Sequence, residues 1–209
     1  MVKTHISGWF IFLFVAMLIV PALMSPDMSR ARLQAEHDSS VAIFGTKKVD
    51  SISETANTVY QAVIGGLGID KLINSGYVKE KDTKKLVFSK RVNTDMSTVT
   101  NRYLESMTLQ IYGVFFRGAL MVNWLLYVGL FMFASMFDGI SQRQVKQETI
   151  QMVSPIKFAL ALHTVVAVIF SPLAYLVLPM NVTPWFMPIW AVVVAFPLSK
   201  AISNAARTG

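Results

Sequence analysis

The chain has 209 residues, of which 54% are hydrophobic and 15% are charged. Soluble domains carry about a quarter charged residues, so this composition indicates a membrane protein and excludes an extended soluble enzyme. A net charge of +7 would suggest nucleic-acid binding in a soluble protein, but here we first assign it to membrane topology. There is no cysteine, which excludes disulfides, cysteine-ligated metals and cysteine catalysis.

Four apolar runs predict four membrane-spanning helices, over residues 6–24, 118–137, 158–178 and 185–199. The first run would rise about 28 Å as a helix, close to the thickness of a hydrocarbon core. A cleavable signal peptide is the alternative for this run. Because Pro26 follows Ser25 where cleavage would fall, we expect an uncleaved anchor. Pro179 and Pro184 enclose a tight turn, so the last two spans should form an antiparallel hairpin.

The placement of lysine and arginine predicts the topology. The connection 138–157, the C-terminal tail and the N-terminus are basic, whereas the turn 179–184 has no charge. We therefore expect both termini and the 138–157 loop to be cytoplasmic, in the inner membrane of a bacterium. The predicted organisation is a transmembrane anchor (1–24), a periplasmic, mostly helical domain (25–110) and a three-helix membrane domain (111–209).

Residues 25–110 read as helices joined by short breaks. A capping box at 50–54 predicts a helix start, and the glycines at 65–68 predict its end. A short helix should follow at about 69–74 and end at Gly76, before an exposed basic connection at 79–91. From about Ser97 one helix of roughly 40 residues should run straight into the second span.

The sequence has no phosphate-binding loop and no arrangement of residues for nucleophilic catalysis, and its three histidines lack metal-ligand spacing. We therefore expect no enzymatic activity, no cofactor and no metal. Arg117 borders the second span, and its side chain should reach the membrane edge as an anchor.

Two features of the membrane domain are candidates for contacts with partners. The fourth span carries a small residue at every fourth position, which would let its own third span, another copy or a different protein approach closely. The inner loop, expected to break the second span at Asp138-Gly139, is either a solvated basic loop or a docking surface for a cytoplasmic partner. The residues of the stripe are Ala191, Ala195, Ser199 and Ser203, and those of the docking surface are Asp138, Gly139, Arg143 and Lys146.

The second half of the chain resembles a family of small membrane proteins of integrating conjugative elements and conjugative plasmids. The resemblance rests on Asp138-Gly139 and Arg143 after one span, followed by a span that leads to the turn 178–184 and by a last span. The resemblance covers roughly residues 100–205. It implies an accessory inner-membrane protein of a type IV secretion system, encoded beside the coupling-protein ATPase and acting as its membrane partner.

Other functions remain open from the residues alone. A structural subunit of the mating channel or an entry-exclusion protein would act through the 25–110 loop, and a homo-oligomer is compatible with either. A pore or transport subunit is disfavoured because no continuous charged path crosses the spans. Direct DNA binding through five basic residues would be weak and salt-sensitive. These residues are Arg143, Lys146, Lys157, Lys200 and Arg207.

Overall fold

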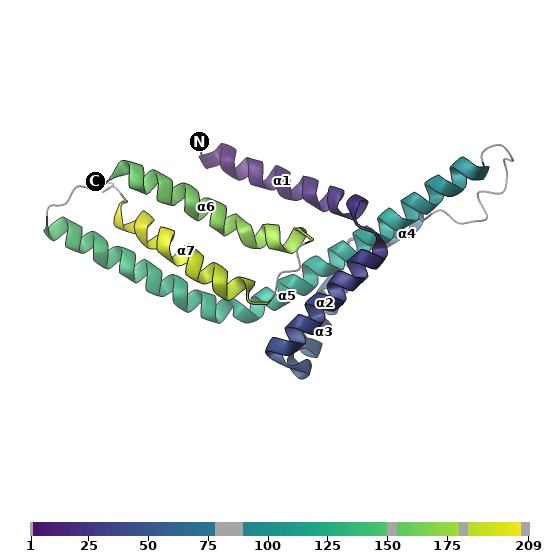
Figure 1. Cartoon of the computed structure of the whole chain (residues 1–209), viewed down its shortest axis with the longest axis horizontal. Helices are drawn as coiled ribbons and strands as arrows, with labels where there is room; N and C mark the ends of the chain where they lie inside the picture. Colours follow the sequence, from purple (N-terminus) through teal and green to yellow (C-terminus); the bar gives the residue numbers. More distant parts are fainter. Residues whose placement is uncertain (1, 78–89, 150–153, 180–183, 206–209) are drawn as a thin grey trace. The chain divides into compact units, whose positions relative to one another are not determined.

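The computed structural model describes residues 2–77, 90–149, 154–179 and 184–205, and every regular element within these ranges is helical (Figure 1). Four helices are long and apolar enough to cross a membrane, in agreement with the four spans expected from the sequence. They are α1 (Val2–Leu23), α5 (Lys90–Glu148), α6 (Pro155–Val177) and α7 (Phe186–Ser203). Large apolar side chains on them are exposed, as lipid-facing side chains would be.

The chain divides into two compact units, which we describe separately. The bundle unit comprises the described residues within Met1–Leu13, Met121–Tyr175 and Pro184–Gly209. The hairpin unit comprises those within Phe14–Leu120 and Leu176–Thr183. The domain boundaries expected from the sequence, after residues 24 and 110, stay predictions.

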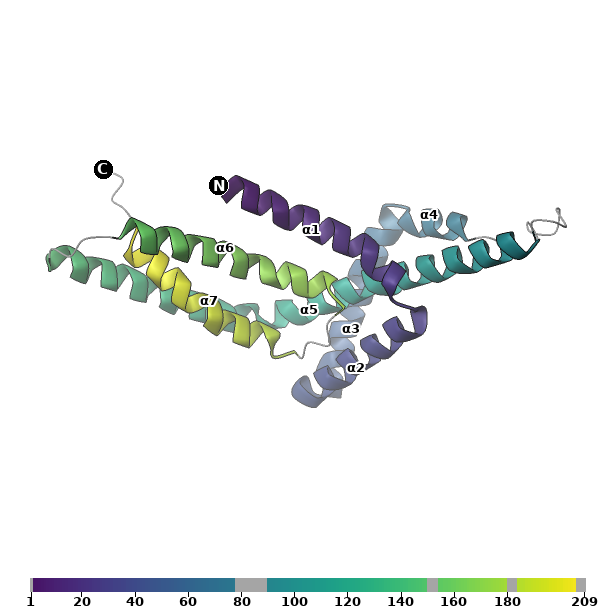
Figure 2. The ribbon, with the colours of Figure 1, turned by 45° about the horizontal axis from the view of Figure 1, so that its top comes forward.

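In the bundle unit, α6 and α7 pack antiparallel, as the sequence predicted. The rings of Tyr175 and Phe186 stack with centroids 4.4 Å apart, and the indole Nε1 of Trp190 donates a hydrogen bond to the Val168 carbonyl over 2.6 Å. Figures 1 and 2 both show the two helices side by side. Pro172 lies inside α6 and Pro197 inside α7. Residues 180–183 of the expected turn are outside the described residues.

Helix α5 is longer than the sequence predicted, with 59 residues instead of roughly 40. It does run without a break into the second span. The break expected at Asp138-Gly139 is wrong, because the helix continues to Glu148. A glycine inside a helix costs only about 1 kcal/mol, and here Gly139 is buried against α7, where its lack of a side chain permits a close approach.

The hairpin unit adds helices that the apolar runs did not reveal. Helix α2 (Pro26–Phe44) begins after Ser25, whose hydroxyl accepts a hydrogen bond from the Met28 N–H over 3.3 Å. Gly45, with φ of 78°, separates it from α3 (Thr46–Tyr60), which packs beside it (Figure 2). The helix start expected at 50–54 is therefore wrong. Those residues lie inside α3, since the positive φ of Gly45 already provides the break.

The remaining breaks of the hairpin unit agree with the sequence. Helix α3 passes into a π-helical turn, η1 (Gln61–Gly65), and the chain turns at Gly68, which has φ of 67°. Helix α4 (Ile69–Gly76) follows, close to its expected bounds. The basic connection expected at 79–91 falls almost entirely outside the described residues.

Candidate functional site: a buried ionic cluster between α2 and α5

The buried face of α2 is polar. Its buried residues after the first turn are spaced three or four positions apart, so they lie along one side of the helix. They are Ser29, Arg32, Glu36 and Ser40, each at most 5% exposed. A helix that buries charge needs partners of matching chemistry, because an isolated buried charge is expensive.

Helix α5 provides the matching stripe. Its buried polar residues and one buried glycine in this region also recur every three or four positions, and they are Ser106, Gln110, Gly113 and Arg117. Gly113 permits the close approach, since a Cβ atom built there would lie 3.2 Å from the Leu33 Cδ2 atom. The two helices therefore meet through small and polar side chains, a pattern typical of helix pairs in membranes.

The centre of the interface is an ion pair between Arg117 and Glu36. The guanidinium meets the carboxylate with two donors: Nε lies 2.9 Å from Oε2, and Nη2 donates to Oε1. Arg117 is 0% exposed and the Glu36 side chain is 4% exposed. Bidentate pairing of this kind fixes both the distance and the orientation of the two helices.

Arg117 also binds the C-terminal end of α6. Its Nη1 atom donates hydrogen bonds to the carbonyls of Leu176, at 3.1 Å, and Leu178, at 2.8 Å. The Gln110 side-chain amide donates to the Val177 carbonyl between them. The last carbonyls of a helix have no partner within it, so these donors supply the cap that α6 needs in a water-poor environment.

Arg32 gives the cluster an excess positive charge, because two guanidinium groups share the single carboxylate of Glu36. Its Nη2 donates to the Gln110 side-chain oxygen over 2.9 Å, while its Nε lies 3.6 Å from Glu36 and has no hydrogen-bond partner. Burial, and secondly the positive charge of Arg117, lower the pKa of Arg32. Arg32 is therefore the least satisfied member of the cluster.

The cluster is arranged for holding helices together. Its groups are cations, one carboxylate, amides and hydroxyls in fixed contacts. Among the residues that the structure describes, no three histidine, aspartate or glutamate side chains group in a way that could hold a metal ion.

The guanidinium of Arg117 is enclosed by protein and paired with Glu36, so its side chain does not extend into solvent. The anchoring role at the membrane edge that the sequence predicts for Arg117 stays a prediction. The sequence reasoning missed Arg32, Glu36 and Gln110. The available signal was the spacing of polar residues in 29–40 and 106–117, which matches one helix face in each segment.

The small-residue stripe of α7 packs on α5 in the bundle unit. Ala191 clusters with Val128. The Ser135 hydroxyl donates to the carbonyl of Ala195. Two further contacts come from the C-terminal end of the stripe. Ser199 donates a hydrogen bond to the Asp138 carboxylate, and the Ser203 carbonyl accepts one from the Lys146 ammonium over 3.2 Å. Within the described residues, these contacts of the stripe are all with α5, the second apolar helix.

The four residues expected to form a partner surface have different surroundings. Gly139 is buried, and a Cβ atom there would lie 2.8 Å from the Ile202 Cβ atom. Lys146 also reaches the Asn204 side-chain oxygen at 3.0 Å. Asp138 is exposed, and its carboxylate also accepts from Gln142. Arg143 is half-buried and has no ion pair or hydrogen bond within the described part of the chain.

These features define a helical membrane-associated protein with four apolar helices and a buried polar interface. The chain belongs to the family described as IncC plasmid conjugative DNA transfer protein DtrJ-like, whose profile matches residues 20–208. The family confirms the resemblance to proteins of conjugative plasmids, and it is a conjugative DNA transfer family, not a known enzyme family. No curated protein and no solved structure matches the chain.

Proposed function

We propose that this conjugative transfer protein is an accessory subunit in the bacterial inner membrane that binds the coupling ATPase of a type IV secretion system. The family membership supports a role in DNA transfer. The observation that supports a cytoplasmic partner is the position of the positive charges in the bundle unit.

Basic residues of the bundle unit gather at one end. The C-terminal end of α5, the start of α6 and the end of α7 lie together there (Figure 1). Their cations are Arg143, Lys146, Lys157 and Lys200. The sequence between α6 and α7, residues 178–185, carries no charge. By the positive-inside rule the basic end faces the cytoplasm, and the 25–110 segment is then periplasmic.

Arg143 is the cation best suited to contact a partner. Lys146 is held by Ser203 and Asn204, and Lys200 donates to the Gln142 side-chain oxygen over 3.1 Å. The side chains of Arg143 and Lys157 have no such contact within the described residues, and we prefer Arg143 because of the geometry of its guanidinium group. A guanidinium group at the membrane surface fits an acidic patch on a cytoplasmic protein, because its fork of donors pairs readily with carboxylates.

The topology is tested by labelling single cysteines, since the chain has none of its own. Glu54→Cys and Gln147→Cys place a thiol at two exposed positions. An impermeant maleimide should label the first in intact spheroplasts and the second only after lysis. The reverse pattern would refute the proposed orientation.

The partner is tested by affinity purification in mild detergent from cells that carry the whole conjugative element, followed by mass spectrometry. We expect the coupling ATPase to be recovered with the native chain and lost with Arg143→Glu. Gln147→Glu is the matched control, because it adds a negative charge to the same helix without removing the cation. Recovery of periplasmic channel subunits alone would contradict the proposal and favour a structural role of the 25–110 segment.

A further inference from the structure

The apolar face of α3 continues beyond the part that α5 covers. Ile52, Ala56 and, in η1, Ile64 are buried, and Val59 and Val63 lie next to this buried face, four positions apart. Val59 is 42% exposed and Val63 is 37% exposed, and Leu67, after η1, is 70% exposed. These three residues form an apolar strip outside the four apolar helices, and we call it the α3 strip.

Two apolar helices end beside the same stretch of α5, and their ends mark a membrane boundary. At the end of α1, the carbonyl of Met24 accepts a hydrogen bond from Ser106 over 2.9 Å. At the end of α6, the carbonyls of 176–178 accept from Gln110 and Arg117. Because both helices are long enough to cross a bilayer, residues 106–117 of α5 lie at the level where each leaves it.

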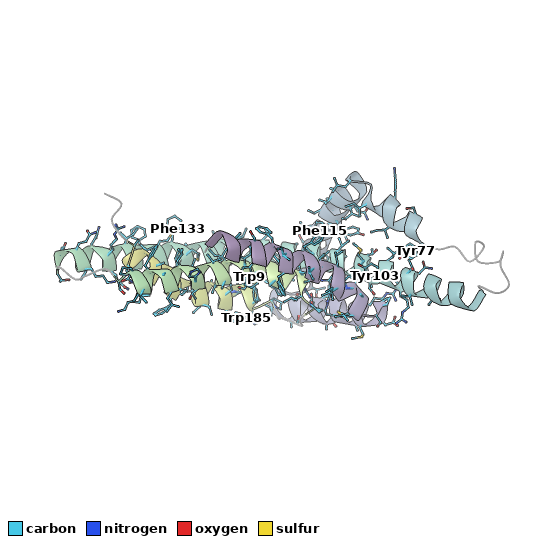
Figure 3. All side chains as sticks on the ribbon, turned by 90° about the horizontal axis from the view of Figure 1, so that it is seen from above. Trp9, Tyr77, Tyr103, Phe115, Phe133 and Trp185 are labelled. Atoms are coloured by element: carbon cyan, nitrogen blue, oxygen red, sulfur yellow. The ribbon has the colours of Figure 1, made fainter. Side chains whose placement is uncertain are left out.

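Helix α3 packs on α5 at this level. The ring of Tyr60 lies 6.0 Å from that of Tyr112 and 5.8 Å from that of Phe115, which is labelled in Figure 3. A small core cluster joins the two helices, and its buried members are Ile52, Ala56, Phe116 and Leu120. Phe116 and Leu120 lie at or beyond the boundary level, toward the apolar part of α5. Because Tyr60 contacts Tyr112 and Gly76 lies beside Leu104, α3 and α4 follow α5 in the opposite direction, away from its apolar part. The α3 strip therefore extends from the level of Tyr112 toward that of Ser106, within the boundary stretch.

We infer that the α3 strip binds the lipid surface, with Val59, Val63 and Leu67 reaching the acyl chains and the opposite side of α3 facing water. An amphipathic helix lies in the interface in this way when its apolar side is continuous and its other side is polar. Glu54 and Thr58 lie on the other side of α3 and are exposed. The neighbouring tyrosine rings also suit the headgroup layer. The inference depends on the apolar helices spanning a membrane and not on the identity of a partner.

The test uses single-cysteine variants of the full chain in vesicles of phosphatidylethanolamine and phosphatidylglycerol. Val59→Cys, Val63→Cys and Leu67→Cys are each labelled with a polarity-sensitive fluorophore. Glu54→Cys and Thr58→Cys are the matched controls on the other side of the helix. Lipids with a nitroxide on the acyl chain serve as the quencher in the membrane, and iodide serves as the quencher in water.

We expect nitroxide lipids to quench the three strip labels several-fold more than the two control labels, and the strip labels to emit at shorter wavelength. Iodide should give the opposite order. If iodide reaches the strip labels as well as the controls, the strip lies in water and the inference fails. If neither quencher reaches them, a protein surface covers the strip, and this too overturns the inference. Either result leaves the binding of the ATPase as a separate question.

Discussion

The charge imbalance of the ionic cluster predicts that Glu36 and Arg32 contribute unequally to the stability of the protein. Within the described residues, Glu36 is the carboxylate that faces both buried guanidinium groups, and Arg32 is the second cation. Glu36→Gln removes the charge that neutralises both arginines. Arg32→Met removes a cation and leaves one arginine paired with one carboxylate.

The expected magnitudes follow from the contacts. Glu36→Gln leaves two desolvated cations without an anion, and breaking a buried pair in this way costs about 3–5 kcal/mol of unfolding free energy. Arg32→Met loses the hydrogen bond to Gln110, but it also removes an unsatisfied Nε atom and the repulsion from Arg117. These opposing effects should leave the unfolding free energy within about 1 kcal/mol of the native value.

The measurement is an unfolding titration with dodecyl sulfate in mixed micelles, followed by far-ultraviolet circular dichroism. A double variant, Arg32→Met with Glu36→Gln, completes the cycle and should be less destabilised than Glu36→Gln alone, because it buries only one uncompensated cation. If Arg32→Met costs as much as Glu36→Gln, the excess charge is compensated in another way and the reasoning is refuted.

Three other changes test the helix contacts. Gly139→Ala should destabilise the packing of α5 on α7, because the new Cβ atom would lie 2.9 Å from a backbone carbonyl. Gly129→Ala in the same helix is the control: its Cβ atom meets no atom within 4 Å, so the variant should be as stable as the native chain or more stable. Equal thermal stability of the two variants would contradict this. Trp190→Phe removes the hydrogen bond to Val168 and should cost about 1 kcal/mol in the same titration, and no change would mean that the bond contributes nothing. Arg117→Lys keeps the charge but cannot reproduce the fork of donors, so protease should cut the end of α6 faster, and an unchanged cutting rate would refute the capping role.

The apolar helices were predictable because hydropathy over about twenty residues is a strong signal. The C-terminal end of α5 was not predictable, because an aspartate followed by a glycine in the local sequence is typical of a helix end. In the structure Gly139 is packed against α7, and Asp138 accepts hydrogen bonds from Ser199 and Gln142. Contacts with a distant segment decided the outcome, and these are not visible in the local sequence.

The ionic cluster was missed for a different reason. Helix α2 has no apolar stripe, because the side it buries carries Ser29, Arg32, Glu36 and Ser40. A search for buried helix faces that looks only for apolar residues passes over such a segment. Arg117 was recognised as unusual, but its acidic partner lies 81 residues earlier, and nothing in the spacing connects the two.

The order of the chain also affects how the cluster is assembled during synthesis. Glu36 precedes Arg117 by 81 residues, so the acid has left the ribosome about 4–16 s before the arginine. The carboxylate that pairs with Arg117 is therefore already present when Arg117 leaves the ribosome. The carbonyls of Leu176 and Leu178 are made later still, 59 and 61 residues after Arg117. Helix α6, the third apolar helix, is therefore made after both members of the Arg117–Glu36 pair, and the remaining donors of Arg117 can then bind its end.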